Sequence, residues 1–268
     1  MTIFTNLGKK KLVFGLIHLK PLPGTPLFED GMFEESYEKA VKDAQALYNG
    51  GADGCLVQTV DKIYPSTDDA DYARVSALAI ITHAVKQVTG PEFHVGAQIM
   101  WNCITPSLGV AKAAGAVFTR ATALIGTTTS AFGIINADPL KVANYRKLIG
   151  AQGIGIISEI QGYHFDWVGG DLPIEQRARM AMMAGADAVE VMHGDEDKNN
   201  AMVTQIKKMN PDTPVILGGA TNLENVKSRL SLADGALVGS CFENGKWGSA
   251  IDENIVKEYV GIVRSLEK

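Results

Sequence analysis

The chain alternates short apolar runs with longer segments of helical spacing, and this alternation constrains its fold more than any other feature. Such a pattern is typical of parallel strands joined by crossover helices. The spacing predicts strands at residues 12–17, 54–58, 94–99, 116–120, 155–159, 188–192, 215–217 and 235–238. Eight such units close most simply into one (β/α)8 barrel, a TIM barrel, spanning residues 1–268 as a single domain.

An open, doubly wound sheet has the same periodicity, but the phosphate-binding turn that goes with it is missing. The first predicted strand leads into His18-Leu-Lys-Pro-Leu-Pro-Gly24, not into G-x-G-x-x-G, and no Walker-type Gly-Lys-Ser follows any strand. A similar phrase recurs before several strands, with a Gly or small residue that can end a helix in the left-handed conformation. The phrases are Gly51-Ala-Asp-Gly54, Ala114-Gly-Ala116, Ala184-Gly-Ala-Asp187 and Leu232-Ala-Asp-Gly235. This repetition indicates one βα unit used several times.

Size and composition fit one soluble barrel. The chain has 268 residues, of which 46% are hydrophobic and 21% charged, against roughly 250 residues in a typical barrel. The net charge of −5 gives no reason to expect nucleic-acid binding, because phosphate backbones attract clustered Lys and Arg. The first apolar run is too short for a signal-peptide core or a membrane span. Three cysteines without a CxxC pair favour a reducing compartment, so we expect a cytoplasmic protein without structural zinc.

Polar side chains cluster where the predicted strands end. Catalytic groups of a (β/α)8 barrel come from these ends, so position alone makes such residues candidates. Three of the five histidines fall just past a strand. The candidates are His18, Gln58, Thr59, Asp61, Gln98, Asn102, Arg120, Glu159, Gln161, His164, His193 and Asp195, together with the last two turns.

Two glycine-containing turns predict a phosphate site. The seventh strand is followed by Gly218-Gly219 and the eighth by Gly239-Ser240. Glycine lets a backbone approach an oxyanion closely, and amides at a helix start donate to it with a favourable dipole. Many barrels hold a substrate phosphate at these two turns. The alternative is that the glycines only make tight turns.

Arg120 and Glu159 end neighbouring predicted strands, and two uses are open for each. Arg120 either grips a carboxylate or phosphate with its planar fork or forms an ion pair with Glu159. Burial would raise the pKa of Glu159 toward a value that suits a general base, whereas an adjacent arginine would lower it. His164 and His193 either face each other across a substrate as acid and base or bind a divalent metal with Glu159 and Asp195. No H-x-H or H-E-x-x-H spacing fixes such a metal site.

Other mechanisms and the longest loop are less constrained. A Schiff base needs a lysine that projects into the barrel, whereas Lys20 and Lys62 lie in predicted loops. Cys55 lies within a strand, and Cys103 has no histidine nearby in sequence, so neither is a good nucleophile. Residues 121–137 are predicted to form a long loop that either packs on a partner subunit in a homo-oligomer or closes over the site as a lid.

Several motifs occur in order along nearly the whole chain. They are Gly15-Leu-Ile-His-Leu-Lys-Pro-Leu-Pro-Gly-Thr-Pro26, Gly51-Ala-Asp-Gly54 leading to Asp61 and Tyr64-Pro65, Phe118-Thr-Arg120, Tyr145-Arg146, Asn225, and Ala233-Asp-Gly-Ala-Leu-Val-Gly-Ser240. Together they resemble the BtpA/SgcQ family, whose members are similar to ribulose-phosphate-binding barrels. Members are associated with photosystem I accumulation or with carbohydrate operons, and the family name implies no particular reaction.

The chain departs from the family pattern at several strand ends. Gln58-Thr59 stands where the family usually has Glu-Asn, and Trp101-Asn-Cys103 where it has Arg-Asn-Asp. After the fifth and sixth strands, Glu159…Tyr163-His164 and His193-Gly194 replace Asp…Lys-His and Thr-Gly. The retained residues are His18, Asp61, Asn102, Arg120, His164 and the Gly239-Ser240 turn. The resemblance therefore implies that the phosphate-binding part of the site is retained and that the part that reacts with the substrate is altered.

These features favour an enzyme that acts on a small phosphorylated, sugar-like metabolite by proton transfer, as an isomerase, an epimerase or a metal-assisted lyase. In this hypothesis the glycine turns hold the phosphate, and Arg120 and Asn102 stabilise a developing oxyanion. Glu159, His164 or His193 exchange protons, and His18 and Asp61 belong to the same site. The alternative is a non-catalytic assembly or regulatory factor that uses the barrel as a scaffold. The polar mouth favours the enzyme, because a scaffold needs no such cluster.

Overall fold

The computed structural model describes residues 1–5, 7, 8 and 10–267, and it contains a closed barrel of eight parallel strands. Around the barrel the strands follow in the order β1, β11, β10, β9, β7, β4, β3, β2. Their bounds are β1 (Leu12–His18), β2 (Gly54–Gln58), β3 (His94–Gln98), β4 (Phe118–Ala121), β7 (Gly155–Gln161), β9 (Ala188–Val191), β10 (Val215–Leu217) and β11 (Gly235–Val238). The predicted TIM barrel is confirmed, and each strand lies within two residues of its predicted bounds.

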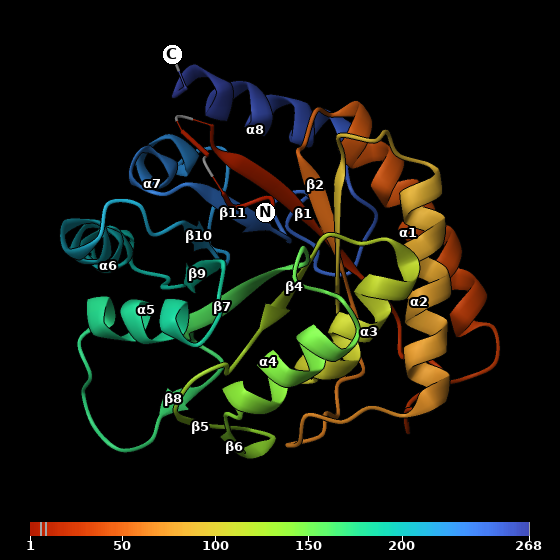
Figure 1. The fold of residues 1–268 in the computed structure, drawn as a ribbon. Coiled ribbons are helices and arrows are strands. Elements are labelled where there is room, and N and C mark those ends of the chain that lie inside the picture. The colour runs from red at the N-terminus through yellow and green to blue at the C-terminus, as the bar shows by residue number, and fades with distance from the viewer. Residues whose placement is uncertain (6, 9, 268) are drawn as a thin grey trace.

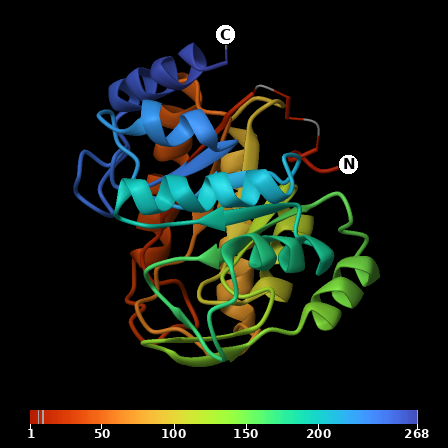
Figure 2. The same cartoon turned by 90° about the vertical axis from the view of Figure 1, so that its left-hand side faces the viewer.

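Helices follow the barrel strands and form an outer layer around them (Figures 1 and 2). They are α1 (Met32–Asn49), α2 (Tyr72–Gln87), α3 (Ile104–Ala114), α4 (Pro139–Leu148), α5 (Ile174–Met183), α6 (Glu196–Met209), α7 (Val226–Leu232) and α8 (Glu253–Ser265). Several begin at an aspartate that accepts a backbone N–H: Asp71 from Ala73, and Asp138 from Lys141. Pro139 occupies the first turn of α4, where its missing N–H costs little.

Apolar side chains close the end of the barrel at which the strands begin. Because side chains on a strand alternate between faces, every second residue points inward. Phe14 of β1 and Phe118 of β4 meet inside at 4.8 Å between ring centroids. The ring of Phe4, from the N-terminal segment, packs edge-on against both, at 6.4 and 6.1 Å. Polar chemistry is thereby restricted to the other end of the barrel, where the strands terminate.

Glycines end three of the helices as expected. Gly51, Gly115 and Gly185 have φ of 85°, 78° and 99°, the left-handed region in which a side chain is strained. The fourth phrase is different, because Ala233 has an extended backbone with φ of −94°. The repeated phrase therefore has the same backbone conformation in three places, and the fourth shares only the sequence pattern.

The segment 121–137 is not the loop that was predicted. It contains a hairpin of β5 (Thr127–Ser130) and β6 (Gly133–Asn136), and β5 also pairs antiparallel with β8 (Asp166–Trp167). The three consecutive threonines of β5 favour a strand, because β-branched residues suit an extended backbone. Gly133, with φ of 106°, closes the two-residue turn at Ala131 and Phe132. This small sheet lies apart from the barrel, at the lower edge of Figure 1.

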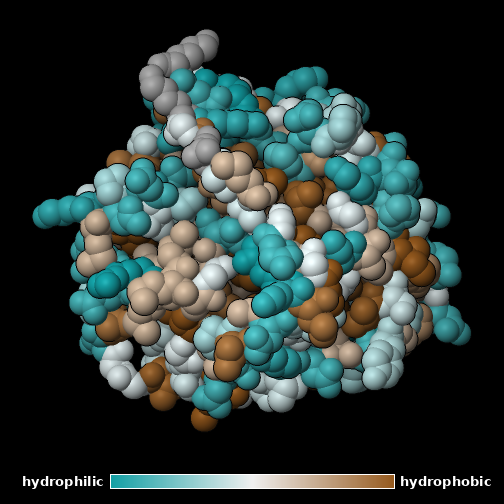
Figure 3. Space-filling model, viewed as in Figure 1, coloured by the Kyte–Doolittle hydropathy of each residue, from teal (hydrophilic) through white to brown (hydrophobic). Residues whose placement is uncertain are grey.

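The outer surface is mixed. Hydrophilic and hydrophobic side chains are interspersed over the face drawn in Figure 3. None of the helices in the described part of the chain has the length and hydropathy needed to cross a membrane.

Candidate active site

A cavity of about 450 Å³ opens where the barrel strands end, which is within the usual range for small-molecule sites. Its walls come from the strand-to-helix loops and its floor from inward-facing strand residues. The lining consists of Leu16, His18, Gln58, Val60, Tyr64, Met100, Trp101, Arg120, Ala131, Phe132, Glu159, Tyr163, His164, Met192, residues 218–221 and 239–241, and Trp247. Seven predicted site positions in addition to Arg120 and Glu159 are among them: His18, Gln58, His164, Gly218, Gly219, Gly239 and Ser240.

Strand periodicity places two charged side chains on the cavity floor and a third, fully buried, beside them. Phe118, Ile157 and Ala188 belong to the apolar cluster inside the barrel. The residues two positions further along β4, β7 and β9 are Arg120, Glu159 and Glu190, so they share the inward face one layer higher. Glu159 and Glu190 are direct partners in the register of β7 and β9. Two carboxylates thus stand side by side next to one guanidinium.

Arg120 joins both carboxylates. Its Nε and Nη2 donate to the two oxygens of Glu190 at 2.7 and 2.6 Å. Nη2 also lies 3.1 Å from Oε1 of Glu159, which accepts a further hydrogen bond from the Thr122 hydroxyl at 3.2 Å. Gly218 is required beside this pair, because a Cβ there would come within 1.8 Å of Glu190 Oε1. The predicted contact of Arg120 with Glu159 is present, but Glu190 is the closer partner.

The charged groups on the cavity floor have shifted pKa values. Burial raises the pKa of Glu159 to about 8, and the Glu190 carboxylate adds to this, against the attraction of Arg120 and the bond from Thr122. Burial lowers the pKa of the Arg120 guanidinium, but the two carboxylates outweigh it and the net pKa is higher than usual. Glu159 therefore carries a proton at neutral pH, while Arg120 and Glu190 form an ion pair.

His164 lines the same cavity among aromatic rings. Its ring lies 5.0 Å from that of Tyr163 and 6.1 Å from that of Trp101, centroid to centroid. Burial lowers the pKa of His164, and the positive charge of Arg120 lowers it further. His164 is thus a neutral imidazole at neutral pH, able to accept a proton, and it lines the same cavity as a carboxyl that holds one. Opposite pKa shifts of two groups in one cavity are a frequent mark of an acid–base pair.

A second histidine, His18, is buried and lines the cavity together with a carboxylate. His18 Nδ1 lies 3.0 Å from Oε1 of Glu243, and the ring of Trp247 is 5.1 Å away between centroids. The Glu243 carboxylate accepts from Nδ1, so Nε2 is the ring nitrogen that remains available to a ligand. Gly239 makes room for this ring, since a Cβ there would lie 3.1 Å from His18 Cε1.

The two glycine turns supply backbone donors to the cavity. Ala220 takes the left-handed conformation with φ of 55°, and Asn225 Nδ2 donates to its carbonyl at 2.9 Å. The amides of Ala220, Thr221, Ser240 and Cys241 form no hydrogen bond to any other described residue. Free amides at the start of a helix or tight turn form an anion-binding concavity. The turns therefore leave backbone donors at the edge of the cavity unpaired within the described part of the chain.

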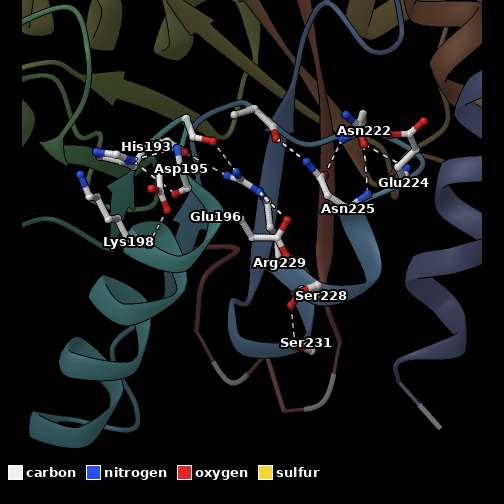
Figure 4. A network of polar contacts seen from close by, with 12 residues as sticks. His193, Asp195, Glu196, Lys198, Asn222, Glu224, Asn225, Ser228, Arg229 and Ser231 are labelled. Carbon is white, nitrogen blue, oxygen red and sulfur yellow. Dashed lines mark hydrogen bonds and ion pairs between the residues drawn. The ribbon is translucent and has the colours of Figure 1, made fainter.

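The prediction that His193 faces His164 across a substrate is wrong. His193 lies outside the cavity lining, and its Nδ1 accepts the amide of Asp195 at 3.0 Å. Arg229 of α7 donates to the carbonyls of His193 and Gly194 at 3.0 and 2.9 Å, which holds this loop against the next helix (Figure 4). The imidazole is part of the cap of α6, because Asp195 is its N-cap residue.

Asp61 and Asn102 are also structural rather than cavity residues. Asp61 is buried and accepts from Arg74 Nη1 at 2.9 Å, so it joins the loop after β2 to α2. Asn102 exchanges two hydrogen bonds with the backbone of Ala123, at 2.7 and 3.1 Å, and fixes the segment that leads from β4 into the hairpin. The predicted role of Asn102 as an oxyanion donor is therefore not available to it.

Metal and thiol chemistry have little support among the described residues. No three His, Cys, Asp or Glu side chains of the described chain are grouped as metal ligands. The predicted set of Glu159, His164, His193 and Asp195 is not brought together. Burial raises the pKa of all three cysteine thiols, so none is an activated nucleophile. No lysine is among the residues found to line the cavity.

Sequence reasoning missed Glu190 and Glu243. Glu190 sits inside the apolar run Ala-Val-Glu-Val, where a single charge at an inward position signals a buried functional group. Glu190 lies two residues after Ala188 in the same strand, so both point to the same face, and this spacing was the signal that could have found it. Glu243 lies in an irregular turn after β11, and only the fold brings it to His18.

Comparison with known proteins assigns the chain to a family. The model of the BtpA family matches residues 9–265. The chain belongs to the BtpA family. An uncharacterized protein of Archaeoglobus fulgidus is 30% identical over 88% of this chain and 93% of its own length. The sgc region protein SgcQ of Escherichia coli, another relative of this BtpA-family chain, is 24% identical over 98% and 97%.

Solved structures agree on the fold of this BtpA-family protein. Mycobacterium tuberculosis tryptophan synthase superposes with a TM-score of 0.64 at 14% identity, covering 98% of both chains. Thiamine phosphate pyrophosphorylase from Pyrococcus furiosus gives a TM-score of 0.56 at 16% identity, covering 97% and 98%. At such low identity the likeness shows the barrel alone.

Proposed function

We propose that this protein is an enzyme that isomerises or epimerises a small phosphorylated metabolite, or cleaves it as a lyase, by acid–base proton transfer. The observation that carries the proposal is Arg120 held between Glu159 and Glu190 on the floor of a cavity whose far rim is made by two glycine turns. A buried guanidinium fixed next to a protonated carboxyl stabilises negative charge that develops on a substrate oxygen.

The phosphate is assigned to the turns after β10 and β11. The free amides of Ala220, Thr221, Ser240 and Cys241 point to an anion as their acceptor. His18 stands next to Gly239 and places its ring at the same rim. The names of two structural neighbours support this class of ligand, since they specify thiamine phosphate and 3-hexulose-6-phosphate.

Proton transfer is assigned to His164 and Glu159. The neutral His164 removes a proton from a carbon next to a carbonyl, and the Glu159 carboxyl donates its proton to the carbonyl oxygen. Arg120 stabilises the enediol while it carries negative charge. In an isomerisation, His164 returns its proton to the former carbonyl carbon, and the hydroxyl on the carbon that lost it gives its proton back to Glu159. In an epimerisation, the carbon takes a proton from water on its other face, while Glu159 recovers its own proton from the oxygen and His164 releases the abstracted one to water.

The test is ligand binding followed by turnover. Phosphorylated sugars and sugar acids, above Kd and with and without Mg²⁺, are expected to raise the melting temperature by several degrees. Stabilising compounds are then followed by NMR in deuterated water, where the enzyme exchanges carbon-bound hydrogen for deuterium.

The variant and its control decide between enzyme and scaffold. Glu159→Gln is expected to keep the thermal shift and to lose exchange by 10²-fold or more, while Glu92→Gln, an exposed substitution at the opposite end of the barrel, keeps both. Binding without exchange by the unmodified protein would contradict the enzyme and favour the non-catalytic regulatory factor. Binding of no phosphorylated compound would contradict the phosphate site.

A further inference from the structure

An aromatic wall, defined as Tyr64, Trp101 and Phe132, lines one side of the cavity. Ring centroids are separated by 6.0 Å for Tyr64–Trp101, 4.8 Å for Tyr64–Phe132 and 5.1 Å for Trp101–Phe132. The three rings come from three different loops: those after β2 and β3 and the turn between β5 and β6. None of the proposed proton-transfer steps uses them.

The aromatic wall stands across the barrel from the glycine turns. In the closed order β1, β11, β10, β9, β7, β4, β3, β2, strand β3 is four positions from β10, and β4 is four positions from β11. Trp101 follows β3, and Phe132 lies in the hairpin that follows β4. A ligand with its phosphate at the turns must therefore extend its other end over Arg120 toward the aromatic wall.

We propose that the substrate is a phosphate ester whose far end is a planar aromatic ring, seated on the aromatic wall. This inference rests on the proposed function, because the phosphate site sets the direction of the ligand. Aromatic rings attract one another in edge-on and offset arrangements beyond the area they bury. Three rings within 4.8 to 6.0 Å of each other provide such contacts from more than one direction.

The wall suits a ring better than a sugar, because it offers few hydrogen bonds. Its neighbours in the lining are Val60, Met100 and Ala131. Trp101 Nε1 is sealed from solvent, with no partner among the described residues. Sugar hydroxyls placed here would give up bonds to water without replacement, which is costly.

The experiment is a calorimetric titration of the full chain with a matched series of probes. The probes are 3-phenylpropyl phosphate, 3-cyclohexylpropyl phosphate, propyl phosphate and inorganic phosphate, with 3-phenylpropanol as the compound that lacks a phosphate. We expect 3-phenylpropyl phosphate to bind on the order of tenfold more tightly than the cyclohexyl compound, and more tightly still than propyl phosphate. Equal affinity of the phenyl and cyclohexyl compounds would overturn the aromatic ring in favour of a merely apolar group.

Two variants of one hairpin residue make the test specific. Phe132 lies at the turn and is half-buried, so its replacement does not open the barrel core. Phe132→Leu is expected to remove the preference for phenyl over cyclohexyl while leaving propyl phosphate affinity unchanged. Ile134→Ala, an exposed change two residues away, is the control and keeps the preference. A preference that survives Phe132→Leu would overturn the assignment to this wall.

Failure of the inference is distinguishable from failure of the proposed function. If propyl phosphate and inorganic phosphate bind but the phenyl group adds nothing, the inference fails and the phosphate site stands. If 3-phenylpropanol binds while no phosphate compound does, the proposed function fails and, with it, the phosphate-to-ring direction.

Discussion

Arg120 and Glu190 form a two-pronged ion pair inside the barrel, with N–O distances of 2.7 and 2.6 Å. Only 7% of Arg120 and none of Glu190 is exposed. Removing two charges from water costs free energy that only close contact offsets, so such a pair adds little net stability. Its effect is to fix the guanidinium in one orientation under the ligand, with Nη1 free of hydrogen bonds to the described residues.

Loss of this arginine should be costly to folding. Arg120→Met leaves Glu190 buried without its partner and is expected to lower the free energy of unfolding by about 3–5 kcal/mol. Urea denaturation at neutral pH measures the change. Arg179→Met, at an exposed site on α5, should stay within about 0.5 kcal/mol of the unmodified protein. Equal stability of the two variants would show that the buried pair does not form.

The proton on Glu159 should make stability depend on pH. Its pKa is raised from 4.5 to about 8 on folding, so the folded state holds the proton more tightly than the unfolded chain. The resulting stabilisation is complete below about pH 4.5 and is lost as the pH rises through about 8, at up to about 1.4 kcal/mol per pH unit. Glu159→Gln should lack this dependence, so it gains on the unmodified protein between these pH values in chemical denaturation. Parallel pH curves for the two proteins would contradict the raised pKa.

Gly218 should not tolerate a methyl group. A Cβ there would lie 1.8 Å from Glu190 Oε1, so Gly218→Ala must displace the buried carboxylate from Arg120. We expect a loss of about 2 kcal/mol or more in unfolding free energy. Gly261→Ala is the matched control: it lies within α8 with no atom within 4 Å of its Cβ, and it should gain about 0.5–1 kcal/mol. Similar changes at both sites would argue against the close contact.

The Glu243 carboxylate should set the tautomer of His18. Glu243→Leu removes the acceptor 3.0 Å from Nδ1, so the proton is no longer held on that nitrogen. Nitrogen-15 NMR of the histidine side chains is expected to show a protonated Nδ1 for His18 in the unmodified protein and its loss in the variant. The exposed His83 should give the same signals in both. An unchanged His18 spectrum would mean that the carboxylate does not hold the ring.

The barrel was accessible from sequence because its signals are local. Apolar runs and helix-ending glycines such as Gly51 and Gly185 depend on a few neighbouring residues. The small sheet was missed because the second partner of Thr128 is Trp167, far along the chain. Asn102 and His193 end in structural hydrogen bonds for a similar reason: position past a strand end does not determine where a side chain points.

The site residues likewise divide into those with a local sequence signal and those without one. Arg120 and Glu159 could be found as strand-end residues, whereas Glu190 required the inward face of a strand to be counted residue by residue. The His18–Glu243 contact joins residues 225 positions apart and has no local signature.

The three-stranded sheet outside the barrel links two loops that would otherwise move separately. Strand β5 pairs with β6, whose turn carries Phe132, and with β8, which begins two residues after His164. We therefore expect a ligand that displaces Phe132 to displace the proposed base, His164, as well. A substrate that fits the aromatic wall poorly would then be turned over slowly, while its binding affinity would change little.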